Sequence, residues 1–256
     1  MMLTAHINKQ NIPLVSVITI VYNAESTIEQ TILSVLAQTY PNIEYIIIDG
    51  GSTDGSLKII DKYKDKITKW ISEPDNGISD AFNKGIKFSS GNLIALLNAD
   101  DWYEKDAVKK VVENYTNKYT VLCGNVKLYN NLNNFKIKKS SIDSIESVMN
   151  VWHPGMFCPK EIYDEIGLYN IDIKILMDYD FVIRCYLAKI NFKFIDENIV
   201  NMRYGGVSNQ LITKSMKEAL IIKENHFGKK FKHKLEYLFF NSYYHTIIYI
   251  KKIIYG

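Results

Sequence analysis

The stretch Leu93-Ile94-Ala95-Leu96-Leu97-Asn98-Ala99-Asp100-Asp101-Trp102 decides how this chain folds. Its five leading apolar residues show no polar alternation and follow a Ser-Ser-Gly turn, which predicts a buried strand. Asp100 and Asp101 then stand where this strand leaves the sheet, and ligands bind at that edge of open α/β sheets. Adjacent carboxylates there suit a hard divalent cation that bridges to phosphates. The same pair could instead cap the next helix, near Glu104 or Lys105.

Strand and helix signals alternate regularly before this stretch. Runs of β-branched apolar residues predict strands, and apolar residues on one helical face predict helices. The expected strands are residues 14–22, 43–48 and 67–72, and the expected helices are residues 27–38, 56–63 and 78–88. This alternation predicts an α/β fold with a mostly parallel, doubly wound sheet flanked by helices. Right-handed crossovers should bring the carboxyl ends of the strands to one edge.

Each expected strand of this half ends in a polar or acidic cluster. The clusters are Tyr22-Asn23, Asp49, residues 73–75 and residues 98–101. A structural sheet needs no acid at every strand end, so their convergence favours a ligand site. Residues 49–55 (DGGSTDG) lack the G-x-G-x-x-G spacing and any basic residue, which argues against a dinucleotide cradle or a P-loop. Asp49 could bond a ribose hydroxyl or a base edge, or it could simply cap a turn.

The composition limits the possible classes of protein. A chain of 256 residues with 47% hydrophobic residues can form one large α/β domain, with or without a tail. The net charge of +3 is too small to argue for a nucleic acid partner. Three widely spaced cysteines without a C-x-x-C pair predict neither zinc nor disulfides, and they favour a cytoplasmic location. The polar first eleven residues predict no signal peptide, and no apolar run predicts a spanning helix.

Three segments together resemble the nucleotide-binding half of glycosyltransferase family 2, whose members are inverting enzymes of the GT-A fold. They are residues 17–25 (VITIVYNAE), 48–56 (IDGGSTDGS) and 98–101 (NADD). A fourth segment, residues 72–85 (SEPDNGISDAFNKG), is similar to a branch that builds bacterial surface polysaccharides such as O-antigen and capsule. The resemblance runs from about residue 13 to residue 210.

This resemblance implies roles for particular positions. The residues that match nucleotide contacts in the family are Tyr22, Asn23, Glu25, Asp49, Asp80, Asn98 and Ala99. Among them, Tyr22 and Asp49 match residues that hold the uracil of a UDP-sugar. Residues 98–100 occupy the D-x-D site, whose last acid binds Mg²⁺ or Mn²⁺ on the diphosphate. Because Asn98 stands in place of the first acid, Asp100 could hold the metal alone or together with Asp101.

A second pair of acids lies in residues 175–184 (ILMDYDFVIR). On a helix, Asp178 and Asp180 point about 200° apart, so they cannot share one task. Asp178 stands near the positive end of the helix dipole and matches the general base of the family, although it could be only an N-cap. Asp180 could orient its neighbours or pair with Arg184, four residues further on.

Four further side chains are candidates for donor or acceptor contacts. They are Lys84, His153, Asp180 and Arg203. His153 precedes a proline, which predicts extended backbone, and it could contact the diphosphate or be a packed structural histidine. Arg203 lies in residues 202–209, whose double glycine permits close approach to a ligand. This segment resembles the one that folds over the donor in the polysaccharide branch.

We divide the chain into three parts. Residues 1–12 are expected to be an extension, residues 13–212 a GT-A domain, and residues 213–256 a basic aromatic helical tail. Within the domain, residues 13–102 would bind the nucleotide and residues 103–212 the acceptor. The tail mixes lysines with aromatic and aliphatic residues, so it could lie in a membrane interface or pack on the domain or on the partner of a homodimer.

The expected function is inverting transfer of a sugar from a UDP-sugar to an acceptor hydroxyl, which gives a β-linked product from an α-linked donor. The resemblance and the basic tail favour a glycan on a polyprenyl diphosphate at the inner face of the plasma membrane. A nucleotidyltransferase is an alternative, but residues 22–26 lack the basic residues that would hold a triphosphate. A catalytically silent sugar-nucleotide binder is another, supported only by Asn98 and opposed by Asp100 and Asp178.

Overall fold

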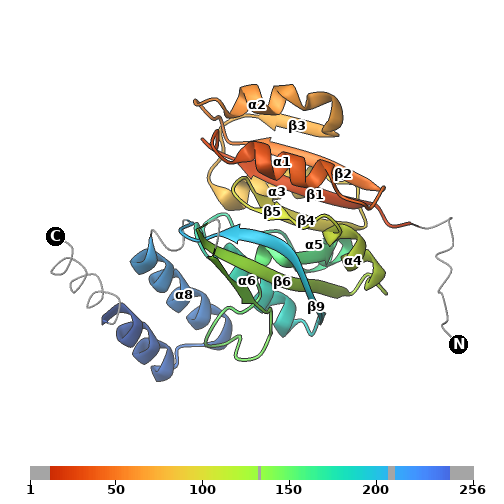
Figure 1. The fold of residues 1–256 in the computed structure, drawn as a ribbon. Coiled ribbons are helices and arrows are strands. Elements are labelled where there is room, and N and C mark those ends of the chain that lie inside the picture. Colours follow the sequence, from red (N-terminus) through yellow and green to blue (C-terminus); the bar gives the residue numbers. More distant parts are fainter. Residues whose placement is uncertain (1–11, 132–133, 207–210, 243–256) are drawn as a thin grey trace, which may run out of the picture.

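The first half of the computed structural model alternates strands and helices (Figure 1). The model describes residues 12–131, 134–206 and 211–242. The elements of this half are β1 (Val15–Val21), α1 (Ile28–Leu36), β2 (Ile43–Asp49), α2 (Ser56–Lys62), the 3-10 helix η1 (Lys64–Lys66), β3 (Lys69–Ser72), α3 (Ile78–Phe88) and β4 (Leu93–Asn98). Every strand and helix expected in this half is therefore present.

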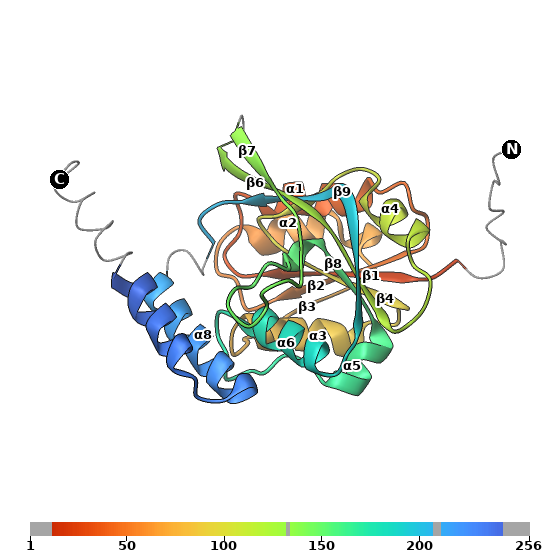
Figure 2. The ribbon, with the colours of Figure 1, turned by 90° about the horizontal axis from the view of Figure 1, so that it is seen from below.

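The second half mixes short strands, long strands and helices. Its elements are β5 (Trp102–Tyr103), α4 (Ala107–Glu113), β6 (Thr120–Asn131), β7 (Asn134–Lys138), the 3-10 helix η2 (His153–Gly155), β8 (Met156–Pro159), α5 (Lys160–Ile166), α6 (Met177–Leu187), β9 (Asn191–Arg203) and α8 (Ile212–Phe227). Residues 231–242 are also helical and lie beside α8 in both views (Figures 1 and 2).

One sheet runs through the molecule in the order β3-β2-β1-β4-β8-β6-β9-β5, with β7 paired to β6. The pairs β2–β3, β1–β2 and β1–β4 are parallel, as predicted for a doubly wound half. Beyond β4 the sheet becomes mixed, because β8 is antiparallel to both β4 and β6, whereas β9 runs parallel to β6. The α/β prediction is confirmed, and β4 lies at the junction of the two halves.

Helices cover both faces of the sheet (Figure 2). Successive strand side chains point to opposite faces, so each strand contributes to two cores. Val17 and Ala95 pack in the core that α1, α2 and α4 cover, whereas Ile18 and Leu96 pack in the core under α3, α5 and α6. Gly85 of α3 is essential to this contact, because a Cβ there would lie 2.3 Å from Cγ2 of Ile18.

The three cysteines are free and buried. All three belong to the core under α3, α5 and α6. Burial raises the pKa of the Cys185 thiol to about 12, which makes it an unreactive core side chain.

Two local predictions are wrong. His153 begins the 3-10 turn η2 instead of being extended, and the residue before it, Trp152, is the extended one (φ −86°, ψ 103°). A proline is tolerated in the first turn of a helix, because the N–H that it lacks would have no partner there. The helix expected from Glu104 or Lys105 begins at Ala107, because β5 first pairs with β9.

The C-terminal helices pack on the second half of the molecule, chiefly through α8 against α6. Ile222 and Lys223 of α8 are buried, and the Lys223 ammonium bonds both the Ser147 carbonyl and Glu236 of the 231–242 helix. Within the described residues, none of the helices combines the length and the apolar character that crossing a membrane requires. The remainder of the expected tail, residues 243–256, lies outside the described part of the chain.

Candidate active site

The loop after β2 is organised by Asp49. This residue is 0% exposed, and its Oδ2 accepts hydrogen bonds from the backbone N–H groups of Gly51 and Ser52 at 3.0 Å each. The hydroxyl groups of Ser52 and Ser72 also donate to its carboxylate. Gly51 has a φ of +85°, which a residue without a side chain adopts readily. Asp49 therefore fixes the loop from inside and presents no exposed oxygen to a nucleotide.

The loop after β1 is held to the β2 loop by a similar exchange. Oδ1 of Asn23 accepts from the N–H of Thr53 at 2.8 Å, and Oε2 of Glu25 accepts from the N–H of Gly55 at 3.0 Å. Asn23 and Glu25 thus have structural partners. The Tyr22 ring at the end of β1 is different, since the residue is 67% exposed at the carboxyl edge of the sheet. A free aromatic face there suits a stacked base.

Asp80 and Lys84 hold the loop between β3 and α3. Oδ2 of Asp80 accepts from the N–H of Asn76 at 3.0 Å, and this bond and the nearby Lys84 ammonium lower the pKa of Asp80. The Lys84 ammonium lies 2.8 Å from the Glu73 carboxylate and donates to the Pro74 carbonyl at 3.1 Å. Both candidate contacts are therefore engaged in shaping residues 73–77.

At the end of β4, Asp101 points into the molecule. It is 1% exposed, its Oδ2 accepts from Nδ2 of Asn98 at 3.3 Å, and its Oδ1 has no hydrogen-bond partner in the described structure. Burial and the neighbouring Asp100 carboxylate raise the pKa of Asp101 well above its usual value. The Thr31 hydroxyl bonds the carbonyls of Ala99 and Asp101, which anchors this segment to α1.

Asp100 is only partly buried, and it lies beside Arg203 at the end of β9. Burial raises the pKa of the Asp100 carboxyl, while the Arg203 guanidinium acts in the opposite direction. Nη1 of Arg203 donates to the Asp100 carbonyl at 3.3 Å, and its guanidinium carbon lies 4.6 Å from the centre of the Trp102 ring. An anion and a cation thus stand side by side where β4 leaves the sheet.

His153 connects this strand end to Asp178 in the first turn of α6. Nδ1 of His153 lies 3.5 Å from Oδ2 of Asp178, and Nε2 lies 3.4 Å from Nδ2 of Asn98. The Asn98 amide nitrogen can only donate, so Nε2 accepts and the ring proton sits on Nδ1, facing Asp178. Asn98, His153 and Asp178 therefore form one connected row, although they come from three separate parts of the sequence.

Asp180 lies outside this row. Its two carboxylate oxygens contact Nε of Arg184 at 2.9 Å and Nε2 of His226 in α8 at 2.7 Å. Arg184 also donates to the carbonyls of Ile166 and Leu168 after α5. The pairing of Asp180 with Arg184 is therefore present, and this carboxylate links α6 to α8 directly and to the end of α5 through Arg184.

Sequence reasoning missed the contribution of Glu218 in α8. Its carboxylate accepts hydrogen bonds from the backbone N–H groups of Lys174, Ile175 and Leu176, at 2.9, 2.9 and 3.0 Å. This segment leads directly into α6, so Glu218 helps to set the position of Asp178. A glutamate among lysines on a polar helix is typical of a solvated face, so no signal in the sequence marked it.

The carboxylates at the end of β4 fit a divalent cation whose remaining ligands come from a bound substrate and water. In the described residues, no group of three His, Cys, Asp or Glu side chains is arranged to hold a metal ion. Mg²⁺ and Mn²⁺ sites in phosphate-transferring proteins, however, use one or two carboxylates and complete the shell with phosphate oxygens and water. Asp100 supplies one such carboxylate, and the buried Oδ1 of Asp101 beside it lacks a partner. A metal site whose ligands all come from the protein does not fit the residues described here.

A family model described as Glycosyl transferase family 2 matches residues 16–185, most of the region that carries this site. The chain belongs to glycosyltransferase family 2. The resemblance seen in the strand-end motifs is thereby confirmed, and the mixed sheet flanked by helices is the GT-A fold that the resemblance implied.

Curated relatives cover different parts of this family 2 chain. An uncharacterised glycosyltransferase of Haemophilus influenzae is 46% identical over 103 residues, which are 39% of this chain and 41% of that protein. The hyaluronan synthase of Pasteurella multocida is 29% identical over 87% of this chain but only 23% of its own length. A PGL/p-HBAD biosynthesis glycosyltransferase of Mycobacterium bovis is 26% identical over 81% of this chain and 84% of its own. The chain thus spans less than half of the first two.

Two solved structures illustrate the shared fold. S. aureus TarS 1–349 in complex with UDP-GlcNAc has a TM-score of 0.66 and 18% identity, covering 86% of this chain and 69% of its own. A mannosyltransferase from Pyrobaculum calidifontis in complex with GDP-Man and Mn²⁺ has a TM-score of 0.65 and 15% identity, covering 87% of this chain and 66% of its own. At these sequence identities, the similarity is evidence of a shared fold alone.

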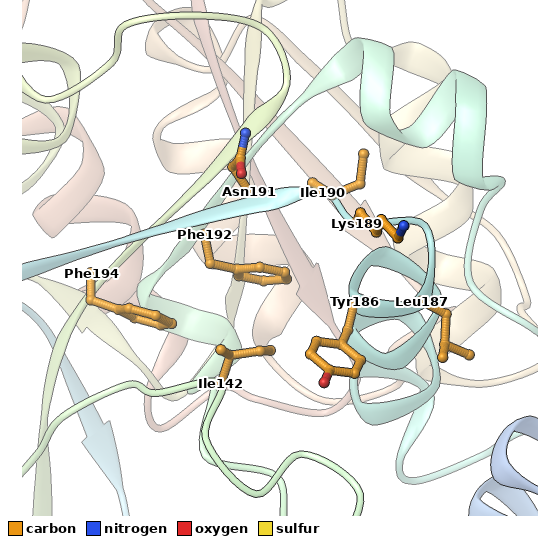
Figure 3. Close-up of a pocket in the computed structure, with 8 residues that line it drawn as sticks. All are labelled: Ile142, Tyr186, Leu187, Lys189, Ile190, Asn191, Phe192 and Phe194. Carbon is orange, nitrogen blue, oxygen red and sulfur yellow. The ribbon is translucent and has the colours of Figure 1, made fainter.

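An open apolar pocket of about 480 Å³ lies away from this site (Figure 3). Its walls are Ile142, Tyr186, Leu187, Lys189, Ile190, Asn191, Phe192 and Phe194. Ile142 lies in the segment between β7 and η2, and the others come from the last turn of α6, the residues after it and the start of β9, whereas Asp178 is in the first turn of α6 and Arg203 ends β9. The pocket is therefore at the opposite edge of the sheet from the candidate site.

Proposed function

We propose that this protein transfers a sugar from a UDP-sugar to an acceptor hydroxyl with inversion at the anomeric carbon. One observation carries the proposal. The Asn98–His153–Asp178 row joins a carboxylate on a helix start to the strand end that presents Asp100 and Arg203. Inverting transfer needs an anchor for the diphosphate and a base on the other side of the reacting carbon, and this row would connect two such groups.

The diphosphate would lie against Asp100 and Arg203. The guanidinium can bond phosphate oxygens directly, and its stacking on Trp102 fixes its direction. A Mg²⁺ or Mn²⁺ ion held by Asp100 would neutralise charge on the departing UDP. The TarS complex with UDP-GlcNAc and the mannosyltransferase complex with Mn²⁺ support a uridine donor and a divalent cation.

Asp178 would act as the general base. It removes the proton from the acceptor hydroxyl while that oxygen bonds to the anomeric carbon and the bond from this carbon to UDP breaks. Because attack occurs on the face opposite the leaving group, an α-linked donor gives a β-linked product. The Nδ1–H of His153 faces Oδ2 of Asp178, so it holds the ionised carboxylate in place before the proton moves.

We further propose that the acceptor is a glycan carried on a polyprenyl diphosphate at a membrane surface, as the resemblance to the surface-polysaccharide branch implies. The 231–242 helix presents an exposed apolar stripe at the spacing i, i+4, i+7, i+8, made of Phe231, Leu235, Leu238 and Phe239. Exposed lysines flank it, among them Lys232 and Lys234. Such a combination suits an interface with anionic lipid head groups.

The membrane contact is tested by sedimentation with vesicles that contain or lack anionic lipid. The full chain should sediment only with the anionic vesicles, and exchange of Phe231 and Phe239 to serine should abolish this. Ile221→Ser is the matched control, because Ile221 is an exposed apolar residue of α8 outside the stripe. Equal sedimentation of all three proteins would contradict the membrane proposal.

The transfer reaction is tested with a panel of UDP-sugars, a lipid-linked acceptor and Mn²⁺, with product linkage read by NMR. Asp178→Asn should reduce transfer by about 10²–10⁴-fold, the range for a general base, while UDP affinity stays unchanged. Asp172→Asn, at an exposed residue of the segment before α6, is the control. Full transfer activity of Asp178→Asn, or consumption of nucleoside triphosphates in place of UDP-sugars, would refute the assignment.

A further inference from the structure

We propose that α8 holds the general base in its reactive position, because this helix contacts the chain on both sides of Asp178. Glu218 bonds the residues just before α6, and His226 contacts Asp180, two residues after Asp178. The inference rests on the proposed role of Asp178 as general base. It makes Glu218 and His226 positioning residues for the transfer reaction.

The first contact joins Glu218 to the start of α6. Its carboxylate accepts three hydrogen bonds, at 2.9, 2.9 and 3.0 Å, from the N–H groups of residues 174–176. Successive backbone N–H groups that point to one place form a concavity that binds an anion. The N-cap residue of α6, Leu176, has no side-chain hydrogen bond that caps the helix. Glu218 therefore supplies the anion at this helix start from another helix.

The second contact lies on the other side of Asp178. Nε2 of His226 is 2.7 Å from Oδ1 of Asp180, whose other oxygen is 2.9 Å from Nε of Arg184. Asp180 is only 6% exposed, so its carboxylate depends on these protein partners in place of water. Asp178 thus lies between two points at which the first turn of α6 is attached to α8.

The two contacts belong to one face of α8, which lies beside α6 (Figure 2). Glu218, Ile222 and His226 follow the spacing i, i+4, i+8, which places their side chains on the same side of a helix. Ile222 is 1% exposed and packs in the core that Phe181 of α6 also joins. Residues eight apart are separated by about 12 Å along a helix axis, so α8 acts as a fixed spacer between the two contacts.

The segment before α6 is also attached to the donor side of the site. The Ser79 hydroxyl in α3 donates to the Ile173 carbonyl at 2.7 Å, and the Lys174 ammonium donates to the Asn76 carbonyl at 3.0 Å. Residues 173–176 therefore lie between α8 and the loop that joins β3 to α3. Without Glu218, only the contacts on the donor side would hold them, and the start of α6 could shift relative to the donor.

Such a shift matters more for the reaction than for the fold. Displacement of a catalytic group by about 1 Å can reduce a rate by about 10²-fold. Lys174 is exposed and Ile175 and Leu176 are only partly buried, so water can bond their N–H groups when Glu218 is replaced. We therefore expect variants of Glu218 to fold. Since α8 lies outside residues 16–185, which match the family model, family membership by itself assigns no role to Glu218.

The test is a double-mutant cycle in the full chain, with transfer rate and UDP affinity measured for each variant. Glu218→Ala should lower kcat by about tenfold to 10²-fold and leave UDP affinity unchanged. Glu218→Gln should lose less, because its amide oxygen still accepts hydrogen bonds. In the Asp178→Asn background, Glu218→Ala should lower transfer by less than about twofold, because the base that it positions is already absent.

His226→Ala should follow the same pattern with a smaller loss, because Arg184 still holds Asp180. Glu224→Ala is the matched control and should transfer like the wild type, because this glutamate of α8 makes none of the contacts with residues 174–180. Thermal unfolding of each variant establishes that it is folded, and Glu218→Gln carries the same cycle if Glu218→Ala does not fold.

Two results would overturn the positioning role and leave the transfer function intact. One is unchanged kcat in folded Glu218→Ala, and the other is an equal loss from Glu218→Ala with and without the Asp178 carboxylate, which a purely structural role predicts. Full transfer activity of Asp178→Asn alone would instead refute the proposed base, and the positioning of that base by α8 with it.

Discussion

The carboxylates near the strand ends differ in the groups that face them. Glu25, Asp49 and Asp80 accept hydrogen bonds from backbone N–H groups of the loops after β2 and β3. Asp100 at the end of β4 lies beside Arg203, and Asp178 at the start of α6 lies beside His153, although Oδ1 of Asp178 also accepts from the N–H of Tyr179 at 2.8 Å. The first group builds the rim of the site, and we expect the second group to carry the chemistry.

This difference shows that an acid at a strand end is weak evidence for a ligand until its partners are known. Loops at the carboxyl edge carry many backbone N–H groups that no strand pairs, and a carboxylate is a compact way to satisfy several of them. This chain therefore has two separate physical reasons for carrying acids at this edge.

The largest effect that we predict here is a difference in activity between variants of Asp100 and of Asp101. Asp100→Asn removes the carboxylate that we propose to lie at the diphosphate, so transfer should fall by about 10²–10³-fold and need more Mn²⁺ for half-maximal rate. Asp101→Asn makes the same change at a buried side chain and should retain most activity. The measurement is kcat/KM against Mn²⁺ concentration for both variants.

Higher activity in Asp100→Asn than in Asp101→Asn would contradict this assignment. Loss of metal response in Asp101→Asn, with Asp100→Asn nearly active, would mean that the buried Oδ1 of Asp101 turns outward to the cation. In that case the metal ligand would be Asp101, whose buried Oδ1 has no hydrogen-bond partner among the described residues, and not the more exposed Asp100.

The next effect is on stability. Asp49→Ala leaves the buried N–H groups of Gly51 and Ser52 without an acceptor, so unfolding should become easier by about 3 kcal/mol. Asp54 accepts N–H groups of Glu25 and Ser56 in the adjoining loop but is more exposed, so Asp54→Ala should cost less. Urea unfolding of the two variants measures this, and equal midpoints would contradict a scaffold role for Asp49.

Much of the structure of residues 13–102 could be predicted from the sequence, because each strand there is a continuous apolar run and each loop is short. The motif at residues 98–101 located the strand end that carries Asp100, and the helix pattern placed Asp178 in a first turn. These are local properties, which periodicity and capping report well.

The remaining contacts join residues far apart in the chain, which periodicity does not report. Asn98 meets His153 across 55 positions, Lys174 reaches Asn76 across 98, and Asp75 lies over Gly50 from another loop. The sequence also gave no means of telling whether Asp49 faces a ligand or its own backbone. Only the three-dimensional contacts separate the two groups of carboxylates.

A smaller effect should come from Asn98, which couples β4 to the base. In Asn98→Asp, the new side chain has only acceptor oxygens, so the ring proton of His153 would face it from Nε2 and Nδ1 would no longer donate toward Asp178. Transfer should fall by about tenfold, because the proposed base loses the group that orients it. A kcat/KM equal to that of the wild type would show that the tautomer of His153 does not matter.

The smallest effect tests a satisfied carboxylate far from the donor. Glu146 contacts Lys230, Lys232 and His233 at 2.7, 2.8 and 3.0 Å, and the two lysines, then the histidine, lower its pKa from 4.5 to about 2. A carboxyl whose pKa is lowered by folding stabilises the protein above its unfolded pKa, so this contribution is complete above pH 4.5 and is lost between there and about pH 2. Glu146→Gln should therefore speed hydrogen exchange in the 231–242 helix at pH 7.

The difference from the wild type should narrow as the pH falls below 4.5, because the wild-type carboxyl is then increasingly protonated too. Glu165→Gln, at an exposed residue of α5, is the control and should leave the exchange unchanged. If Glu146→Gln exchanges like the wild type, the helix is held by its apolar contacts with α8 alone. In that case, a carboxylate with hydrogen-bond partners would stabilise the protein only where it is buried, as Asp49 is, because an exposed ion pair adds little stability.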